Sequence, residues 1–328
     1  MYEPDLRKIK TIIPGLLLAA CLVLGGCGKD DASGQSIDVS TKEHSVNIIT
    51  PEGNNDGGEN GGEENGGGET DPDGDNPTPT VTPDLSSIDT TTIVGEYNPG
   101  RDKTGLPVID QSTLGDSSTI DYLIGVTEKG AVVEIINGTT YVEGVLMVNK
   151  TYRLPSYYVP TNTHANVVGE QNVNEGITAQ AWEAWENIES AARADGCNIW
   201  IASGYRSFDF QKEVFANYAS WDGVEAADTY SARAGHSEHQ TGLCFDLNSI
   251  SDEFADTAAG KWVNDNCWKY GFCIRFPKGK ESYSGYNYES WHLRYVGEEL
   301  AEKLYNNGDW LSMEEFFGLT STYNYDYE

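Results

Sequence analysis

The sequence lacks long apolar runs and has few basic side chains. A membrane-spanning helix needs about 18 or more consecutive apolar residues, and no stretch of the chain reaches that length. Only 21 residues are Lys or Arg against 52 Asp or Glu, so the formal net charge of the 328-residue chain is −31. A surface this acidic repels phosphate backbones. A polytopic membrane protein and a nucleic-acid-binding protein are therefore both excluded.

Cysteine is also scarce, with six in the whole chain. Two of them, Cys21 and Cys27, precede the predicted folded part. No pair among the others has CxxC spacing, which argues against a cysteine-ligated zinc site. Outside the cytoplasm four cysteines can form two disulfides in three connectivities, and small buried thiols are the alternative. The sequence leaves this choice open for the remaining four, which are Cys197, Cys244, Cys267 and Cys273.

The amino terminus has the pattern of a secretory signal. Three basic residues at 7, 8 and 10 precede a short apolar segment over 12–24, which is followed by Gly25-Gly26-Cys27. This end resembles a bacterial lipobox, in which the cysteine is lipidated, although an ordinary signal peptide is the alternative. We expect 1–27 to be a lipoprotein signal and Cys27 the lipidation site. The mature protein would then be extracytoplasmic and lipid-anchored to the outer face of the bacterial cell membrane.

Residues 28–93 have the composition of a disordered tether. They contain 15 acidic and two basic side chains, and 51–70 alone holds eight glycines. Such a segment cannot bury enough apolar surface to offset the entropy lost on ordering. A hydrophilic spacer after a lipid anchor suggests work in the cell wall, away from the bilayer.

Residues 94–145 form a β-rich lead-in of uncertain status. Alternating apolar residues over 132–136 and 140–148 flank Asn137-Gly138, which is a strong signal for a two-residue hairpin. The segment is either the entry to the main domain or a small separate module.

Helices and short strands alternate from residue 146 onward. Apolar spacing predicts helices over 178–194, 207–219, 261–270 and 297–306, with Thr178 as an amino-terminal cap. Short apolar runs predict strands over 198–203, 243–247 and 272–276. This order indicates an α+β domain with a small, mainly antiparallel sheet flanked by helices.

Three of the five histidines lie in two chemically unusual segments, 231–246 and 288–295, whereas His44 and His164 lie in the tether and in a polar loop. Asp246 interrupts an apolar strand, where a carboxylate is costly unless it is paired or metal-bound. Glu289 precedes His292 by three residues.

These residues suggest a hydrolytic metal site. His239, Asp246 and His292 form a sensible N/N/O set for a catalytic zinc with one open position. Glu289 is then the carboxylate that takes a proton from water. Residue types and spacing alone leave the alternative that each histidine is a hydrogen-bonded structural residue.

The motifs that carry this chemistry resemble a known family. Ser237-x-His239-x-x-Gly242-x-x-x-Asp246, with Glu289-x-x-His292 downstream and Ser203-Gly204-Tyr205-Arg206-Ser207 upstream, is similar to the VanY-like D-alanyl-D-alanine carboxypeptidases. These belong to the zinc peptidase family that includes the VanX dipeptidases. The resemblance implies a hedgehog/DD-peptidase-like fold over 146–318 that binds one Zn²⁺. It also implies roles for individual residues: zinc ligation by His239, Asp246 and His292, acid/base catalysis by Glu289, oxyanion contact by Arg206, and substrate binding by Ser237, Gln211 and Trp291.

The resemblance also implies the substrate, which is the peptidoglycan stem peptide. The expected reaction removes the terminal D-Ala. An L,D-carboxypeptidase acting on tetrapeptide stems is the nearby alternative, and a non-catalytic wall-binding module is a more distant one. Non-catalytic domains that keep such a fold usually lack a metal ligand or the acid/base residue. Here the three candidate ligands and Glu289 are all present. The expected partners are stem peptides and, through the lipid, the membrane; the oligomeric state is left open, with a monomer expected.

Cys244 departs from the family pattern, which usually has Ala at that position. We expect its side chain to point away from the metal, with Cys197 or Cys273 as candidate disulfide partners. His236 lies three residues before His239. The family pattern makes His239 the ligand, so we expect His236 to support the site or to lie at its rim.

Overall fold

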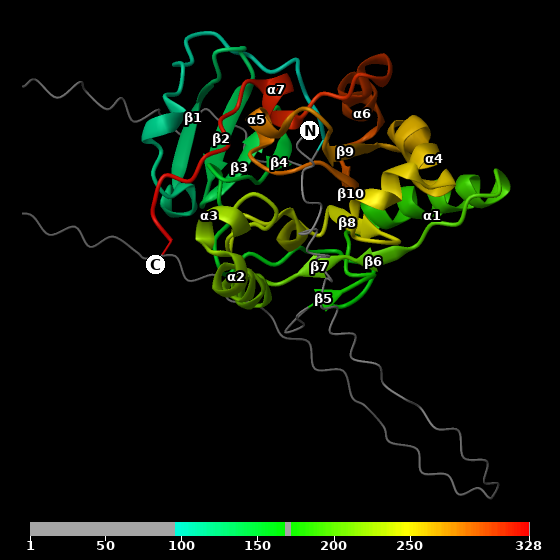
Figure 1. Cartoon of the computed structure of the whole chain (residues 1–328). Coiled ribbons are helices and arrows are strands. Elements are labelled where there is room, and N and C mark those ends of the chain that lie inside the picture. The colour runs from blue at the N-terminus through cyan, green and yellow to red at the C-terminus, as the bar shows by residue number, and fades with distance from the viewer. Residues whose placement is uncertain (1–95, 168–171, 328) are drawn as a thin grey trace, which may run out of the picture. The chain divides into compact units, whose positions relative to one another are not determined.

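The computed structural model describes residues 96–167 and 172–327 (Figure 1). The predicted signal peptide, the lipidation site Cys27 and the tether over 28–93 lie outside the described residues. Within the described part, no helix combines the length and apolar character needed to cross a bilayer.

The first sheet has four antiparallel strands in the order β1-β2-β3-β4. The strands are β1 (Tyr122–Val126), β2 (Val132–Ile136), β3 (Thr139–Val142) and β4 (Val145–Met147). The predicted hairpin is confirmed: Ile136 pairs with Thr139 across Asn137 and Gly138, whose φ angles are 47° and 74°. Both turn residues need positive φ, which Asn and Gly adopt most readily.

The second sheet carries the candidate site. Its order is β6-β8-β10-β9, and all of its pairings are antiparallel. The strands are β6 (Ile201–Ser203), β8 (Cys244–Leu247), β9 (Phe272–Phe276) and β10 (Glu289–Tyr295), and a separate two-stranded pair joins β5 (Asn172–Val173) to β7 (Tyr205–Arg206). The α+β class is thereby confirmed. Strand β10 is not evident from the sequence, because its mixed polar and aromatic residues do not alternate cleanly.

The four predicted helices are present with shifted ends. They are α1 (Ala179–Ala194), α2 (Phe208–Asp222), α4 (Ala258–Asn266) and α6 (Glu298–Tyr305). Thr178 caps α1 by accepting a hydrogen bond from the backbone N–H of Ala181. Helix α4 continues as a 3-10 turn over Cys267–Tyr270. Three short helices were not predicted: α3 (Val224–Ala227), α5 (Glu281–Ser284) and α7 (Met313–Phe317).

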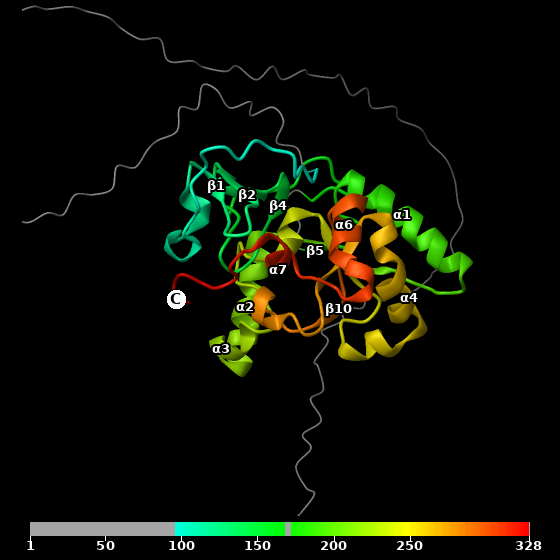
Figure 2. The same cartoon turned by 90° about the horizontal axis from the view of Figure 1, so that it is seen from above.

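One apolar core joins the two sheets and the helices. Val133, Val142 and Met147 of the first sheet share a buried cluster with Phe245 and Leu293 of the second. Helices α1, α4 and α6 lie together on one side of the second sheet, and the first sheet lies on the other side (Figure 2). The lead-in strands are thus packed into the same core as the second sheet.

The cysteines of the described residues form no disulfide. Cys197, Cys244, Cys267 and Cys273 are all free thiols, and the last three are buried. A disulfide from Cys244 to Cys197 or Cys273 is therefore absent. Cys244, Cys267 and Cys273 are instead small buried thiols, which was the alternative.

Candidate active site

The predicted site residues meet on the second sheet. Asp246 on β8 and His292 on β10 are directly paired across the antiparallel ladder. His239 lies on the 3-10 turn Glu238–Thr241 just before β8, and the turn ends at Gly242 with φ of +66°. This left-handed conformation suits glycine and lets the chain reverse into the strand.

Four side chains converge at this point. His239 Nε2 lies 3.4 Å from Asp246 Oδ2, and Asp246 Oδ1 lies 3.3 Å from His292 Nδ1. Glu289 Oε2 lies 3.4 Å from the same His292 nitrogen. The two imidazole rings are nearly perpendicular, with centroids 4.9 Å apart. Residues separated by more than 50 positions in the chain thus direct their polar atoms to one place.

The orientation of His239 is set by the backbone. Its Nδ1–H donates to the carbonyl oxygen of Gly204 at 2.6 Å, so Nε2 is the nitrogen that faces Asp246. Nε2 is buried and has no hydrogen-bond partner in the described residues. A buried imidazole nitrogen without a partner is costly, which is the situation a metal ion relieves.

The electrostatics of the cluster also favour a cation. Burial raises the pKa of Asp246, but the His239 and His292 imidazoles outweigh burial and hold that pKa well below its usual range. Burial lowers the pKa of His292, but Cys244 and Asp246 outweigh it and raise that pKa well above its usual range. A bound metal cation would take the place of the imidazole protons in balancing the carboxylate.

The donor set fits a catalytic zinc. Ligand atoms of Asp246, Glu289 and His292 lie within 4.8 Å of one another, and His239 Nε2 lies beside Asp246. Two imidazole nitrogens and one carboxylate are a common protein ligand set of hydrolytic zinc sites, with the fourth position left for water or substrate.

Cys244 also faces the cluster, and the expectation that it points away is wrong. Its sulfur atom lies within 4.8 Å of ligand nitrogens of His239 and His292. Residues two apart share one face of a regular strand, so Cys244 and Asp246 of β8 point the same way. Burial raises the pKa of the thiol, but the two imidazoles outweigh burial and lower it to about 7.

A cavity of about 540 Å³ opens over the cluster. It brings together the predicted oxyanion residue Arg206 and the predicted substrate residues Gln211, Ser237 and Trp291 beside Glu289. The lining also contains groups that the sequence analysis missed, because loops distant in sequence bring them in and no local motif marks them: Tyr218, Tyr230, Asp252, Glu281, Tyr286, Asn287 and Tyr288.

Two of the predicted substrate residues have polar atoms available to a ligand. Nη2 of Arg206 lies 3.9 Å from Asp246 Oδ2, and Nε of Arg206 is buried without a hydrogen-bond partner. Gln211 donates from Nε2 to the carbonyl oxygen of Ala232 at 2.7 Å, whereas its Oε1 is buried and unpaired. Ser237 begins the 3-10 turn without capping it, which leaves its hydroxyl free of that role.

His236 lies away from the metal cluster. Its Nδ1–H donates to the carbonyl oxygen of Asn149 at 2.8 Å, and Nε2 accepts from the Tyr325 hydroxyl at 2.6 Å. Burial lowers its pKa to about 3, so the ring is neutral. The expectation of a rim position is wrong, because the carboxy-terminal residues cover this histidine. It ties the chain end to the loop after β4.

The family comparison agrees with this geometry. Residues 174–298 match the family model of the VanY D-alanyl-D-alanine carboxypeptidases, and the matched segment contains all four converging side chains. Residues 174–298 form a VanY-family domain. The chain is 41% identical over 181 residues to the putative carboxypeptidase YodJ of Bacillus subtilis, an alignment that covers 52% of this chain and 66% of YodJ.

Two further relatives carry activity names. The chain is 33% identical over 182 residues to a D-alanyl-D-alanine carboxypeptidase of Enterococcus faecalis, covering 52% of this chain and 65% of that protein. The chain therefore spans just under two thirds of the length of these two curated relatives. The solved structure of the LdcB LD-carboxypeptidase is 39% identical, with 53% of this chain and 86% of that chain covered and a TM-score of 0.47.

Proposed function

We propose that this protein is a zinc-dependent D,D-carboxypeptidase that removes the terminal D-Ala from peptidoglycan stem peptides. The observation that carries the proposal is the convergence of His239, Asp246, His292 and Glu289 beneath a cavity lined by Arg206. The VanY-family match over 174–298 supports the same reaction class.

One zinc ion per domain would be held by Nε2 of His239, the carboxylate of Asp246 and Nδ1 of His292. When bound, zinc supplies Lewis-acid polarisation of the scissile carbonyl and makes water a stronger acid at neutral pH. The backbone carbonyl of Gly204 keeps Nε2 of His239 deprotonated and turned to the site, since it receives the Nδ1 proton.

Glu289 is the proton carrier in this proposal. Its carboxylate lies at the edge of the cluster and also lines the cavity, so it can reach both the attacking water and the substrate. The carboxylate accepts a proton from the water during attack on the peptide carbonyl. It then returns that proton to the amine of the departing D-Ala.

Arg206, Gln211, Ser237 and Trp291 bind the substrate. The guanidinium of Arg206 donates hydrogen bonds to the oxyanion that develops on the carbonyl. The unpaired Oε1 of Gln211 is an acceptor for a substrate N–H. Ser237 and Trp291 line the same cavity and hold the terminal residue.

The preference between D,D and L,D substrates is a direct prediction of the proposal. Incubation with pentapeptide stems is expected to yield the tetrapeptide and free D-Ala, whereas tetrapeptide stems stay intact. Mass spectrometry of the digests measures both, with a chelator-treated sample and a zinc-restored sample as controls. Shortening of the tetrapeptide alone would establish the L,D alternative. Loss of neither residue by a protein that holds no metal would indicate a non-catalytic wall-binding module.

We also propose that the protein is anchored by lipid at the outer face of the bacterial cell membrane. The signal pattern ending at Cys27 and the acidic spacer over 28–93 support this placement. In cells, the wild type is expected in the membrane fraction, and Cys27→Ala is expected to remove the lipid and shift the protein out of that fraction. Fractionation followed by immunoblotting measures the change. An unlipidated wild type in the soluble extracytoplasmic fraction would contradict the anchor.

A further inference from the structure

Glu238 is a buried carboxylate that the proposed reaction does not use. It precedes His239 on the 3-10 turn and is only 3% exposed. Its Oε1 accepts from Nε of Arg275 at 2.7 Å and from Nη1 of Arg294 at 2.9 Å. The other oxygen, Oε2, has no hydrogen-bond partner in the described residues.

The free oxygen of Glu238 faces a metal-site histidine. Oε2 lies 3.6 Å from Nε2 of His292, slightly longer than a hydrogen bond. Nε2 of His292 is likewise buried without a hydrogen-bond partner. Two unsatisfied buried atoms, one able to donate and one able to accept, thus lie next to each other, and a small closing movement joins them.

The other nitrogen of His292 points into the cluster. Nδ1 lies 3.3 Å from Asp246 and 3.4 Å from Glu289. A neutral imidazole carries one proton, and only its unprotonated nitrogen can bind a cation. A proton held on Nε2 by Glu238 therefore leaves the lone pair of Nδ1 directed at the metal position.

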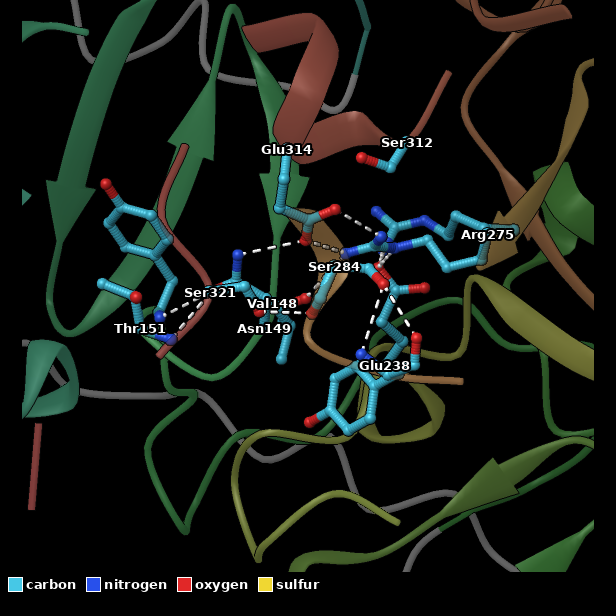
Figure 3. A network of polar contacts seen from close by, with 12 residues as sticks. Val148, Asn149, Thr151, Glu238, Arg275, Ser284, Ser312, Glu314 and Ser321 are labelled. Atoms are coloured by element: carbon cyan, nitrogen blue, oxygen red, sulfur yellow. Dashed lines mark hydrogen bonds and ion pairs between the residues drawn. The ribbon is translucent and has the colours of Figure 1, made fainter. Parts of the chain in front are cut away.

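A buried charge network holds Glu238 in place (Figure 3). Arg275 on β9 donates two hydrogen bonds to Glu314 on α7, at 2.9 and 2.7 Å, in addition to its bond to Glu238. Asn149 donates to Glu314 at 3.1 Å. Arg294 on β10 also reaches the carbonyl oxygen of Leu146 at 2.5 Å. Two arginines balance two glutamates, and β9, β10 and α7 together fix the carboxylate behind His292.

We propose that Glu238 is a positioning residue that accepts the Nε2 proton of His292 and so presents Nδ1 to the metal. The inference rests on the proposed function only in that the cluster binds zinc. Carboxylates that accept the second ring proton of a metal-bound histidine typically contribute 10–100-fold to metal affinity.

A matched pair of variants tests the role of Glu238. Glu238→Gln removes one negative charge and turns the acceptor opposite Nε2 into an amide that can present N–H. Glu314→Gln removes the same charge from the same network but touches no residue of the metal cluster. Zinc affinity of each full-length protein, measured by competition with a chromophoric chelator, is expected to fall about 10–100-fold for Glu238→Gln. Glu314→Gln is expected to bind zinc like the wild type, although both variants melt at lower temperature.

A spectroscopic readout separates positioning from general loosening. In the zinc-loaded wild type, the Nε2–H of His292 is expected to give a slowly exchanging, downfield proton signal in ¹H–¹⁵N spectra. Glu238→Gln is expected to lose this signal and Glu314→Gln to keep it. If Glu238→Gln fails to fold, Glu238→Asp is the second variant. It keeps the negative charge but moves the carboxylate oxygen away from Nε2 of His292, and it is expected to show the same changes to a smaller degree.

Two results would overturn the positioning role. Equal losses of zinc affinity in Glu238→Gln and Glu314→Gln would mean that the affinity depends on the net charge of the buried network and not on a hydrogen bond from His292 to Glu238. Unchanged zinc affinity in Glu238→Gln would remove the role outright while leaving the zinc peptidase proposal standing. Absence of zinc from the wild type would instead contradict the proposed function itself, and the positioning role with it.

Discussion

Glu289→Ala is expected to lower kcat for hydrolysis of a D-Ala-D-Ala-terminated stem peptide by about 10²–10⁴-fold, the usual contribution of a positioned general acid/base. Glu289 lies 3.4 Å from His292 and lines the cavity, whereas the other glutamate beside His292, Glu238, is held by two buried arginines. Without it, the proposed route by which a proton of water reaches the leaving amine is lost when Glu289 is replaced. Steady-state release of D-Ala measures the loss.

Zinc binding should survive this change. The proposed ligands His239, Asp246 and His292 remain, so we expect zinc affinity within roughly tenfold of the wild type. Glu281→Ala is a matched control, because Glu281 also lines the cavity but has no contact with the histidines in the described residues. It is expected to leave kcat close to the wild-type value. Near-normal turnover by Glu289→Ala, with zinc bound, would contradict its role as proton carrier.

Arg275→Met is expected to lower the free energy of unfolding by about 3–5 kcal/mol, the range found when one partner of a buried ion pair is removed. Arg275 is fully buried and contacts Glu238 at 2.7 Å and Glu314 at 2.7 Å. Met matches much of the volume of Arg but supplies no charge, so Glu314 keeps only the Asn149 amide as a described partner for its carboxylate. Urea unfolding monitored by circular dichroism measures the change.

An exposed arginine provides the comparison for Arg275. Arg193 on α1 pairs with Glu189 one turn earlier, and its side chain is 69% exposed. Arg193→Met removes the same charge from a solvated pair, which contributes about 0–1 kcal/mol. Equal destabilisation by the two substitutions would mean that burial of the Arg275 network does not determine its contribution. The double variant Arg275→Met/Glu314→Leu should recover part of the loss, because it also removes a stranded carboxylate.

Much of the fold was predictable from local patterns. Helices α1, α2, α4 and α6 have apolar residues at helical spacing, and Asn137-Gly138 marks the hairpin between β2 and β3. Strand β10 was missed because its sequence mixes partly buried aromatic residues with polar site residues, so its strand character comes from pairing with β8 and β9. The side chain of Cys244 was predicted to point away from the cluster but faces it, because β8 is a regular strand in which Cys244 and Asp246 share one face.

The candidate site was predictable in its chemistry but not in its arrangement. Residue types and the resemblance to the VanY motifs predicted His239, Asp246 and His292 as metal ligands and Glu289 as the acid/base, because this chemistry belongs to the side chains themselves. Only the tertiary structure decided that Asp246 lies opposite His292, which nitrogen of each imidazole faces the cluster, and that Glu238 stands behind His292. These relations join residues separated by up to 54 positions, and strand pairing and burial, which no local pattern encodes, bring them together.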